Sequence, residues 1–364
     1  MNAFVHAFED ILTRAYEVGA SDVHIEPHAD HVHVRVRVDG RMESWQRLED
    51  DARRRRWMEV MKRGCNLDMS RIGAPQDVRF GTEEPPCDYR VALVPGVDGG
   101  EKLVLRLLPR TTSFDLEAYR MPAEAKADLR QALTKRDGLI LVSGPTGSGK
   151  STLLYNALDA LDPDDRTIYT LEDPVEYRLP GLWQCQVDRS RSVGFVELLR
   201  AMMRADPDVM LVGEVRDEET ANAAFHAAKT GHLVLSTVHA NDAAGVAERM
   251  ADLGVPQATF DATVRFVSAQ RLVPRLCDGC REEDPEGAML VSAVLGPVER
   301  AFRGPGCEAC RGLGTRGRLL LMGWMAREAT DDGRSHLVVR HTLRSSAREA
   351  AERGVIRASD AVGY

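Results

Sequence analysis

Apolar residues recur along the chain with two different spacings. Near the amino terminus they follow the spacing of an amphipathic helix, at Val5, Phe8, Leu12 and Ala15. Strict alternation comes next in HVHVRVRVDG, where the valines within residues 32–38 face one way and the histidines and arginines the other. The pattern predicts a half-buried strand that ends in a turn at Asp39-Gly40.

The spacing divides the chain into parts. Two further alternating stretches, YRVALV and KLVLRLLP, predict a small N-terminal α+β domain over residues 1–110, and the proline-flanked residues 111–122 are typical of a linker. From there buried strands such as GLILVSG and VMLVG alternate with amphipathic helices, which predicts an α/β domain with a parallel sheet over 123–276. We expect a cysteine-containing subdomain at 277–310 and a helical tail at 311–364.

Composition narrows the class of protein. With 364 residues, 43% hydrophobic and 29% charged, the chain is expected to be globular, and no stretch approaches the roughly 20 apolar residues of a membrane helix. Any membrane contact is therefore predicted to be peripheral. The net charge of −8 argues against a nucleic-acid partner, and acids flank the one basic run, Arg53 to Arg56, which favours a solvated helix surface.

The strongest local motif is GPTGSGKS, which lies between a predicted strand and a predicted helix. Its glycines let backbone N–H groups surround phosphates, Lys150 can reach the β- and γ-phosphates of ATP, and the Ser151 hydroxyl suits Mg²⁺. The helix N-terminus adds partial positive charge. The predicted nucleotide-binding residues are Gly144, Pro145, Thr146, Gly147, Ser148, Gly149, Lys150, Ser151 and Thr152.

Other motifs follow in a fixed order: TLEDPVEY (170–177), LLRAMMRADPDVMLVGEVRDEETA (198–221) and TGHLVLSTVHAND (230–242). With ASDVHIEP, PQDVR and AQRLVPRLC, they resemble the P-loop ATPases of type II secretion and type IV pilus assembly. The resemblance covers about residues 20–318 and implies a RecA-like P-loop domain. It further implies a Mg²⁺-dependent ATP hydrolase that acts as a homo-hexamer, in the cytoplasm, at the inner face of the membrane. The implied partner is an inner-membrane platform protein.

Three residues are expected to act on the phosphates. Glu214 ends an apolar strand expected next to the P-loop strand, where a carboxylate can orient water or hold Mg²⁺. Glu172 ends another strand, and the resemblance implies that the two glutamates share these duties, with the division between them open. His239 matches the family's histidine box, which implies a hydrogen bond to the γ-phosphate.

Four arginines are candidates for stabilising the charge that develops during phosphoryl transfer. The resemblance implies that Arg79 and Arg90 approach the nucleotide at a subunit junction, and that Arg200 and Arg204 form a pair on one helix face. The alternative for all four is an ordinary surface salt bridge, which contributes little to stability.

Two C-x-x-C pairs predict a metal site in a reducing compartment, which favours the cytoplasm. Cys277, Cys280, Cys307 and Cys310 would give Zn²⁺ four thiolates, and the alternative is reduced free thiols. A second possible metal group is formed by histidines, although their alternation favours the polar face of a strand; these are His24, His28, His31 and His33.

Two other functions stay open. One is a nucleic-acid translocase that shares the P-loop. The other is a ring subunit that binds nucleotide but hydrolyses little, because Val78 stands where the family has glycine and Ala240 removes a hydroxyl beside His239.

Overall fold

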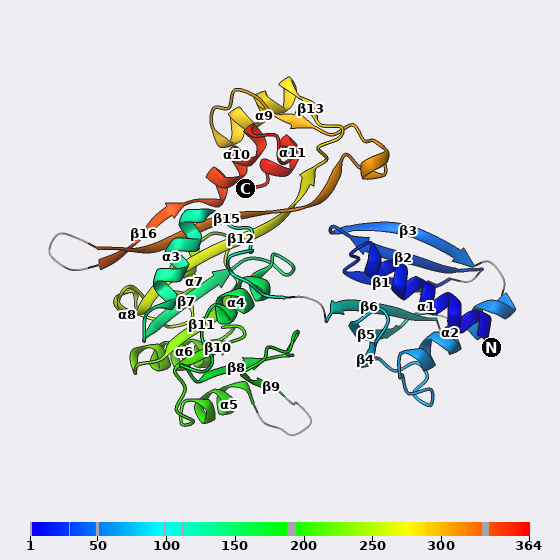
Figure 1. Ribbon diagram of the computed structural model, residues 1–364, viewed down its shortest axis with the longest axis horizontal. Helices are drawn as coiled ribbons and strands as arrows, with labels where there is room; N and C mark the ends of the chain where they lie inside the picture. Colours follow the sequence, from blue (N-terminus) through cyan, green and yellow to red (C-terminus); the bar gives the residue numbers. More distant parts are fainter. Residues whose placement is uncertain are drawn as a thin grey trace. The chain divides into compact units, whose positions relative to one another are not determined.

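The computed structural model describes residues 2–28, 30–48, 51–97, 100–110, 113–187, 194–329 and 335–364, and only the backbone of 2–4, 48 and 51–56 (Figure 1). The chain forms two compact units, Met1–Ser113 and Phe114–Tyr364, which divide inside the predicted linker. The side chains of Arg53 to Arg56, predicted to be solvated, lie outside the described residues. Within those residues, no helix combines the length and the apolar character that a membrane span requires.

The first unit is a six-stranded antiparallel sheet in the order β3-β2-β1-β6-β5-β4, with two helices. Asp39 and Gly40 join β2 to β3 with φ of +50° and +83°, as in a tight hairpin turn. Its elements are α1 (Asn2–Glu17), β1 (Asp22–Pro27), β2 (Val32–Val38), β3 (Arg41–Leu48), α2 (Asp51–Gly64), β4 (Gln76–Thr82), β5 (Cys87–Pro95) and β6 (Glu101–Pro109).

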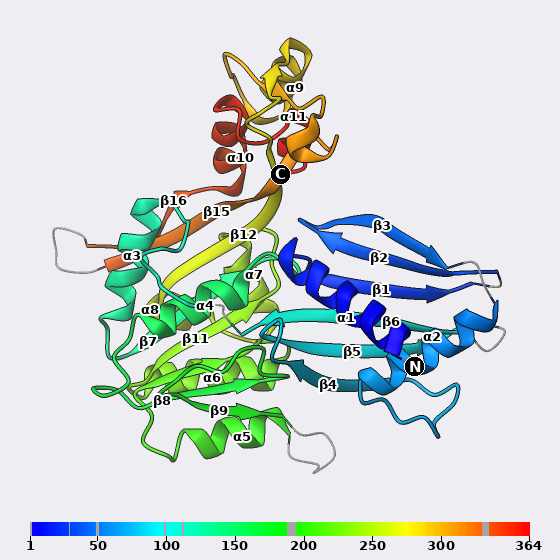
Figure 2. The ribbon, with the colours of Figure 1, turned by 45° about the vertical axis from the view of Figure 1, so that its right-hand side comes forward.

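The core of this unit lies between the sheet and the two helices, which cover one face of the strands (Figure 2). Val32, Val34 and Val36 are fully buried, as their alternation predicts, and they pack with Leu12 of α1 and Met61 of α2. Val5, predicted on the apolar face of α1, is exposed instead.

The second unit contains an eight-stranded sheet in the order β16-β15-β12-β7-β11-β10-β8-β9. The strands from β12 to β9 are parallel, while β15 and β16 add antiparallel pairs at one side. The strands are β7 (Gly138–Ser143), β8 (Ile168–Glu172), β9 (Trp183–Gln186), β10 (Val209–Val212), β11 (Leu233–Val238), β12 (Val264–Leu276), β15 (Thr315–Ala329) and β16 (Ser335–His341).

Helices pack on both faces of this sheet. On one face α3 (Ala123–Leu133) and α4 (Lys150–Asp159) form a core with the segment that begins at Phe114. The opposite core includes four helices: α5 (Phe195–Met202), α6 (Glu218–Lys229), α7 (Gly245–Asp252) and α8 (Gln257–Thr263). Because β7, β10 and β11 are buried on both faces, each consists largely of an apolar run, with serine or threonine only toward the ends of β7 and β11.

A small subdomain follows β12. The helices α9 (Pro285–Leu295), α10 (Leu343–Glu352) and α11 (Ala358–Ala361) pack together, as Figures 1 and 2 both show. Beside them lie the strand pair β13 (Glu282–Glu283) and β14 (Phe302–Arg303) and the short helix η3 (Glu308–Cys310).

Two sequence-based expectations are wrong. The helical tail 311–364 begins with the strands β15 and β16, and only then α10 and α11. The run LLLMGWM hides the strand because Leu321, Met322 and Trp324 are all buried, so the polar alternation is lost. In addition, β10 is not next to the P-loop strand β7, because β11 lies between them.

Candidate functional site

The P-loop connects β7 to α4, and glycine is required at two of its positions. Gly144 has φ of +147°, and a Cβ there would lie 2.5 Å from the Gln270 carbonyl oxygen of β12. Gly149 caps α4 with φ of +90°, in the left-handed region that favours glycine. The loop therefore follows a path that brings its backbone close to the neighbouring strand.

The Lys150 ammonium lies over this loop. Its Nζ donates to the carbonyl oxygens of Gly144 at 2.7 Å and Pro145 at 3.0 Å. Burial lowers the pKa of Lys150, and the nearby Arg271 acts in the same direction, while Glu214 and Glu176 oppose both. The carboxylates of Glu214 and Glu176 are therefore close enough to favour the charged form of Lys150, the ammonium that would contact the phosphates.

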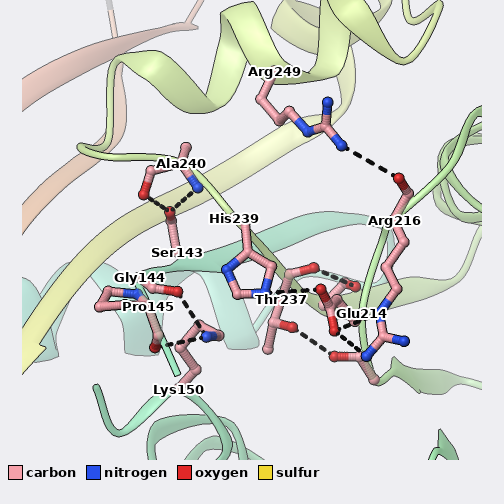
Figure 3. A network of polar contacts seen from close by, with 12 residues as sticks. Ser143, Gly144, Pro145, Lys150, Glu214, Arg216, Thr237, His239, Ala240 and Arg249 are labelled. Atoms are coloured by element: carbon pink, nitrogen blue, oxygen red, sulfur yellow. Dashed lines mark hydrogen bonds and ion pairs between the residues drawn. The ribbon is translucent and has the colours of Figure 1, made fainter. Parts of the chain in front are cut away.

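Glu214 follows β10 and is held by two side chains, as Figure 3 shows. One carboxylate oxygen lies 3.0 Å from His239 Nε2, and the other lies 2.7 Å from Arg216 Nη2. The Glu214 side chain is one-fifth exposed, so this carboxylate borders solvent, where a water molecule can reach it.

Side-chain bonds to the backbone join the strand ends that carry these residues. Thr237 Oγ1 donates to the Gly213 carbonyl at 2.7 Å, which fixes β11 against the start of the Glu214 segment. Ser143, at the end of β7, exchanges hydrogen bonds with the backbone of Ala240 (Figure 3). The carboxyl ends of parallel strands lie at one edge, and here they bring the P-loop, Glu214 and His239 together.

Glu172 lies in a different environment. Its side chain is buried, and its carboxylate accepts hydrogen bonds from Tyr155 Oη, from Thr170 Oγ1 at 2.7 Å and from Gln184 Nε2 at 3.3 Å. Burial raises the pKa of Glu172, although the three donors act to lower it. Tyr155 belongs to α4, so this carboxylate is bonded to the helix that follows the P-loop.

Glu176 is a second carboxylate near the P-loop lysine and was not among the predicted site residues. It is exposed, its charge acts on Lys150, and its backbone N–H donates to Tyr155 Oη at 3.4 Å. The signal was present in DPVEY, where a second acid follows Glu172 by four residues. Arg216 and Arg271 were also missed, because a sequence does not reveal which surface cations turn toward the P-loop.

A sequence model of the type II/IV secretion system protein family matches residues 2–361. This chain belongs to that family. Type II secretion system protein E of Klebsiella pneumoniae is 38% identical over 95% of this chain and 72% of its own length. The type IV pilus assembly ATPase PilB of Thermus thermophilus is 35% identical, and the match covers 95% of this chain but 39% of PilB.

Solved structures agree on the fold. The ATPase DotB of Legionella pneumophila superimposes with a TM-score of 0.66 and 20% identity, over 97% of this chain and 89% of DotB. The pilus retraction motor PilT, solved with bound ADP, gives 0.64 and 24% identity, over 98% of this chain and 96% of PilT. This chain therefore has the P-loop ATPase fold that its sequence predicts.

The four candidate arginines lie in two places. Arg79 and Arg90 face each other across β4 and β5, and Arg90 Nη2 lies 2.6 Å from Asp77 Oδ2. Arg200 pairs with Glu219 at 3.1 Å on the surface. The expectation that Arg204 shares a helix face with Arg200 is wrong, because α5 ends at Met202 ahead of Asp206, whose φ is +53°.

The four cysteines of the two C-x-x-C pairs come together. Their Sγ atoms are 3.8 Å apart between Cys277 and Cys307 and between Cys280 and Cys310, and 3.7 Å apart between Cys307 and Cys310. A tetrahedron with Zn–S bonds of about 2.3 Å has edges of about 3.8 Å, so the residues fit zinc. The pKa of Cys310 is lowered to about 6, because its thiolate would accept hydrogen bonds from the backbone N–H groups of Cys307 and Gly314. The Cys307 group has the larger effect.

The amino-terminal histidines form a second group. His28, His31 and His33 lie close together, and the rings of His28 and His31 stack at 4.6 Å. However, His31 Nδ1 bonds to Asp30 at 2.7 Å and its Nε2 lies 3.0 Å from the Arg47 guanidinium. A cation at Nε2 would have to displace that guanidinium, which favours the polar strand face over a metal site.

Proposed function

We propose that this chain is an ATP-hydrolysing motor subunit that drives protein export or type IV pilus assembly. The observation that carries the proposal is the placement of Glu214 and His239 at the same sheet edge as the P-loop and Lys150. Membership of the type II/IV secretion family supports the same reaction. The names of the relatives support secretion or pilus assembly as the work that is done.

Each residue has a part in hydrolysis. The backbone of residues 144–151 binds the phosphates of ATP, and Lys150 leaves its loop carbonyls to contact the β- and γ-oxygens. Mg²⁺, held through the Ser151 hydroxyl, would neutralise charge on these oxygens when bound. Glu214 orients the attacking water and accepts its proton as the bond to the γ-phosphorus forms and the bond to the leaving ADP oxygen breaks. His239 donates a hydrogen bond to the γ-phosphate and positions the Glu214 carboxylate, which its Nε2 contacts.

Glu172 takes a supporting role in this proposal. Because it is buried and bonded to Tyr155, it positions α4 and the Glu176 segment rather than contacting substrate itself. Glu176 then supplies the second carboxylate at the metal or the water.

The arginines complete the site from another subunit. Arg79, Arg90, Arg200 and Arg204 would approach the phosphates across the junctions of a homo-hexamer, where one arginine is worth about 10³ to 10⁵ in rate. The assembly would act in the cytoplasm, peripheral to the inner face of the membrane, through a platform protein. Zn²⁺ at the four cysteines would be structural, because four thiolates leave no open ligand position.

The deciding experiment measures ATP turnover of the purified hexamer, alone, with nucleic acid, and with candidate membrane platform proteins. Motor function predicts turnover that rises with the platform protein and is abolished in Lys150→Ala. Stimulation by nucleic acid alone would favour a translocase. Bound ATP without turnover under every condition would favour a nearly inactive ring subunit.

A further inference from the structure

A buried amide on β12 makes no hydrogen bond of ordinary geometry within the described residues, and Tyr119 is the polar side chain that acts on it. Gln270 is completely buried, and neither its side-chain oxygen nor its nitrogen makes a hydrogen bond of ordinary geometry. Leaving such groups unpaired in the interior destabilises a fold, because they lose their hydrogen bonds to water without replacing them. An orphaned donor and acceptor on one planar group therefore indicate a ligand that offers the complementary pair.

The position of Gln270 specifies where this ligand would be. The residue before it, Ala269, is paired with Ser143 at the end of β7, and the Gln270 carbonyl packs against Gly144 of the P-loop. A nucleotide whose phosphates lie in that loop must extend its sugar and base past the start of α4. The amide is next to the loop on the strand that borders this path.

Two half-buried side chains, Tyr119 and Leu272, lie beside Gly149 at the end of the P-loop. A Cβ on Gly149 would lie 3.7 Å from Tyr119 Oη and 3.8 Å from Leu272 Cδ1. The phenol is beside the amide, since burial raises the pKa of Tyr119 to about 12 while Gln270 acts to lower it. An aromatic face beside an amide is the combination that binds a nucleobase by stacking and by edge hydrogen bonds.

The segment that carries Tyr119 is fixed to the P-loop helix. Asp115 N–H donates to Asn156 Oδ1 of α4 at 2.7 Å, and Tyr119 N–H donates to the Asp115 carbonyl at 2.9 Å. The Tyr119 backbone is therefore held in place by these hydrogen bonds.

We propose that Gln270 reads the edge of the nucleobase and that Tyr119 stacks on its face, which makes this pair the base-specificity site for a purine with a 6-amino group. The inference rests on the proposed nucleotide site. Gln270 accepts a hydrogen bond from the 6-amino group and donates one to the neighbouring ring nitrogen. The Tyr119 phenol moves off the amide when the base enters.

The test compares ADP with purine riboside diphosphate, the analogue that lacks the 6-amino group, by calorimetric titration of the full chain. The wild-type protein should bind ADP roughly tenfold more tightly than the analogue. In Gln270→Met, which has a side chain of similar length and no amide, both affinities should fall because both nucleotides lose the hydrogen bond to the ring nitrogen. ADP should lose more, so that its roughly tenfold preference over the analogue disappears. Gln270→Glu removes the donor to the shared ring nitrogen but keeps an acceptor for the 6-amino group, so both affinities should fall while the preference for ADP is retained.

Ser268→Ala is the matched control, because Ser268 lies two residues earlier on the same strand, is equally buried and also has an unpaired hydroxyl. It should leave the preference intact. Equal losses for both nucleotides in Gln270→Met would overturn the inference and leave Gln270 a structural residue. If the wild type binds neither nucleotide, the proposed function itself fails, whereas tight ADP binding with an unchanged preference removes the base-reading role alone.

Discussion

At the residue scale, the two glutamates that the sequence treats alike have opposite surroundings. The Glu214 carboxylate borders solvent, and one of its oxygens contacts His239 while the other contacts Arg216. Its negative charge acts to raise the pKa of Lys150. Glu172 is buried and receives three hydrogen bonds, one of them from the P-loop helix. Glu214 is therefore placed to act on the reacting water, and Glu172 to position α4. Each role can be tested separately.

Replacing Glu214 with Gln keeps the shape of the side chain and removes its charge. We expect the variant to retain ATP but to lose turnover by about 10² or more, since a general base contributes about 10²–10⁴ in rate. Nucleotide affinity and steady-state phosphate release measure the two effects. Glu248→Gln, an exposed change on α7, is the control. Wild-type turnover in Glu214→Gln would show that another group is the base.

Glu172 predicts a dependence of stability on pH. Because its pKa in the folded protein is raised by burial above the ordinary 4.5, the folded state holds the proton more tightly than the unfolded state does. Stability from this group is present at low pH and is lost as pH rises through the raised pKa. Glu172→Gln does not titrate, so its stability relative to the wild type should increase as the pH rises above the ordinary pKa of 4.5.

The urea midpoints of both proteins as the pH is raised provide the measurement, with Glu248→Gln as the exposed control. Parallel pH curves for wild type and Glu172→Gln would contradict the prediction. Turnover at neutral pH should fall in Glu172→Gln, because α4 loses a contact that positions it. Tyr155→Phe removes the same hydrogen bond from the other side and should lower turnover equally.

At the element scale, helix α9 buries Val291 and Leu295 against α10 and α11, whereas the loops that carry the four cysteines bury few apolar side chains. Metal is therefore expected to contribute the folding free energy, about 10 kcal/mol or more in small zinc peptides. Cys277→Ser should release zinc and unfold the subdomain locally while nucleotide affinity at the P-loop is retained. Metal content per subunit and ADP titration measure the two.

Cys185→Ser is the control for that change, because Cys185 lies on β9, outside the four-cysteine cluster. Unchanged metal content in Cys277→Ser would refute the assignment, as would a wild-type protein that was purified without chelators and contains no zinc.

At the scale of the whole molecule, two of the candidate arginines, Arg79 and Arg90, lie in a different compact unit from the P-loop. Arg90 belongs to the first compact unit and Lys150 to the second. If neighbouring subunits exchange arginines, mixed rings of Lys150→Ala and Arg90→Ala should recover some turnover, because some junctions pair an intact P-loop with an intact Arg90. Phosphate release from rings of mixed composition is the measurement.

Mixed rings of Lys150→Ala and Glu214→Gln are the matched control. Both changes are in the second unit, so no P-loop in such a ring has both residues and no recovery is expected. Absence of recovery in verified Lys150→Ala and Arg90→Ala rings would argue against supply from a neighbour.

Features that depend on local pattern follow from the amino-acid order alone. Alternation fixed β2, because one face of that strand is buried and the other is polar. The P-loop and the C-x-x-C pairs were identifiable because each needs particular residue types at fixed short spacing, and the four Sγ atoms do come together. The family resemblance was also readable, since several motifs occur in order and the family match spans nearly the whole chain.

Only the tertiary structure decided the contacts between distant segments. The strand β15 was hidden because burial on both faces erases the alternation that a sequence shows. Nothing local distinguishes Glu172 from Glu176, yet packing against Tyr155 buries the first and leaves the second facing Lys150. The orphaned amide of Gln270 is likewise invisible in AQRLVPRLC, because whether a polar group has a partner depends on every element that packs around it.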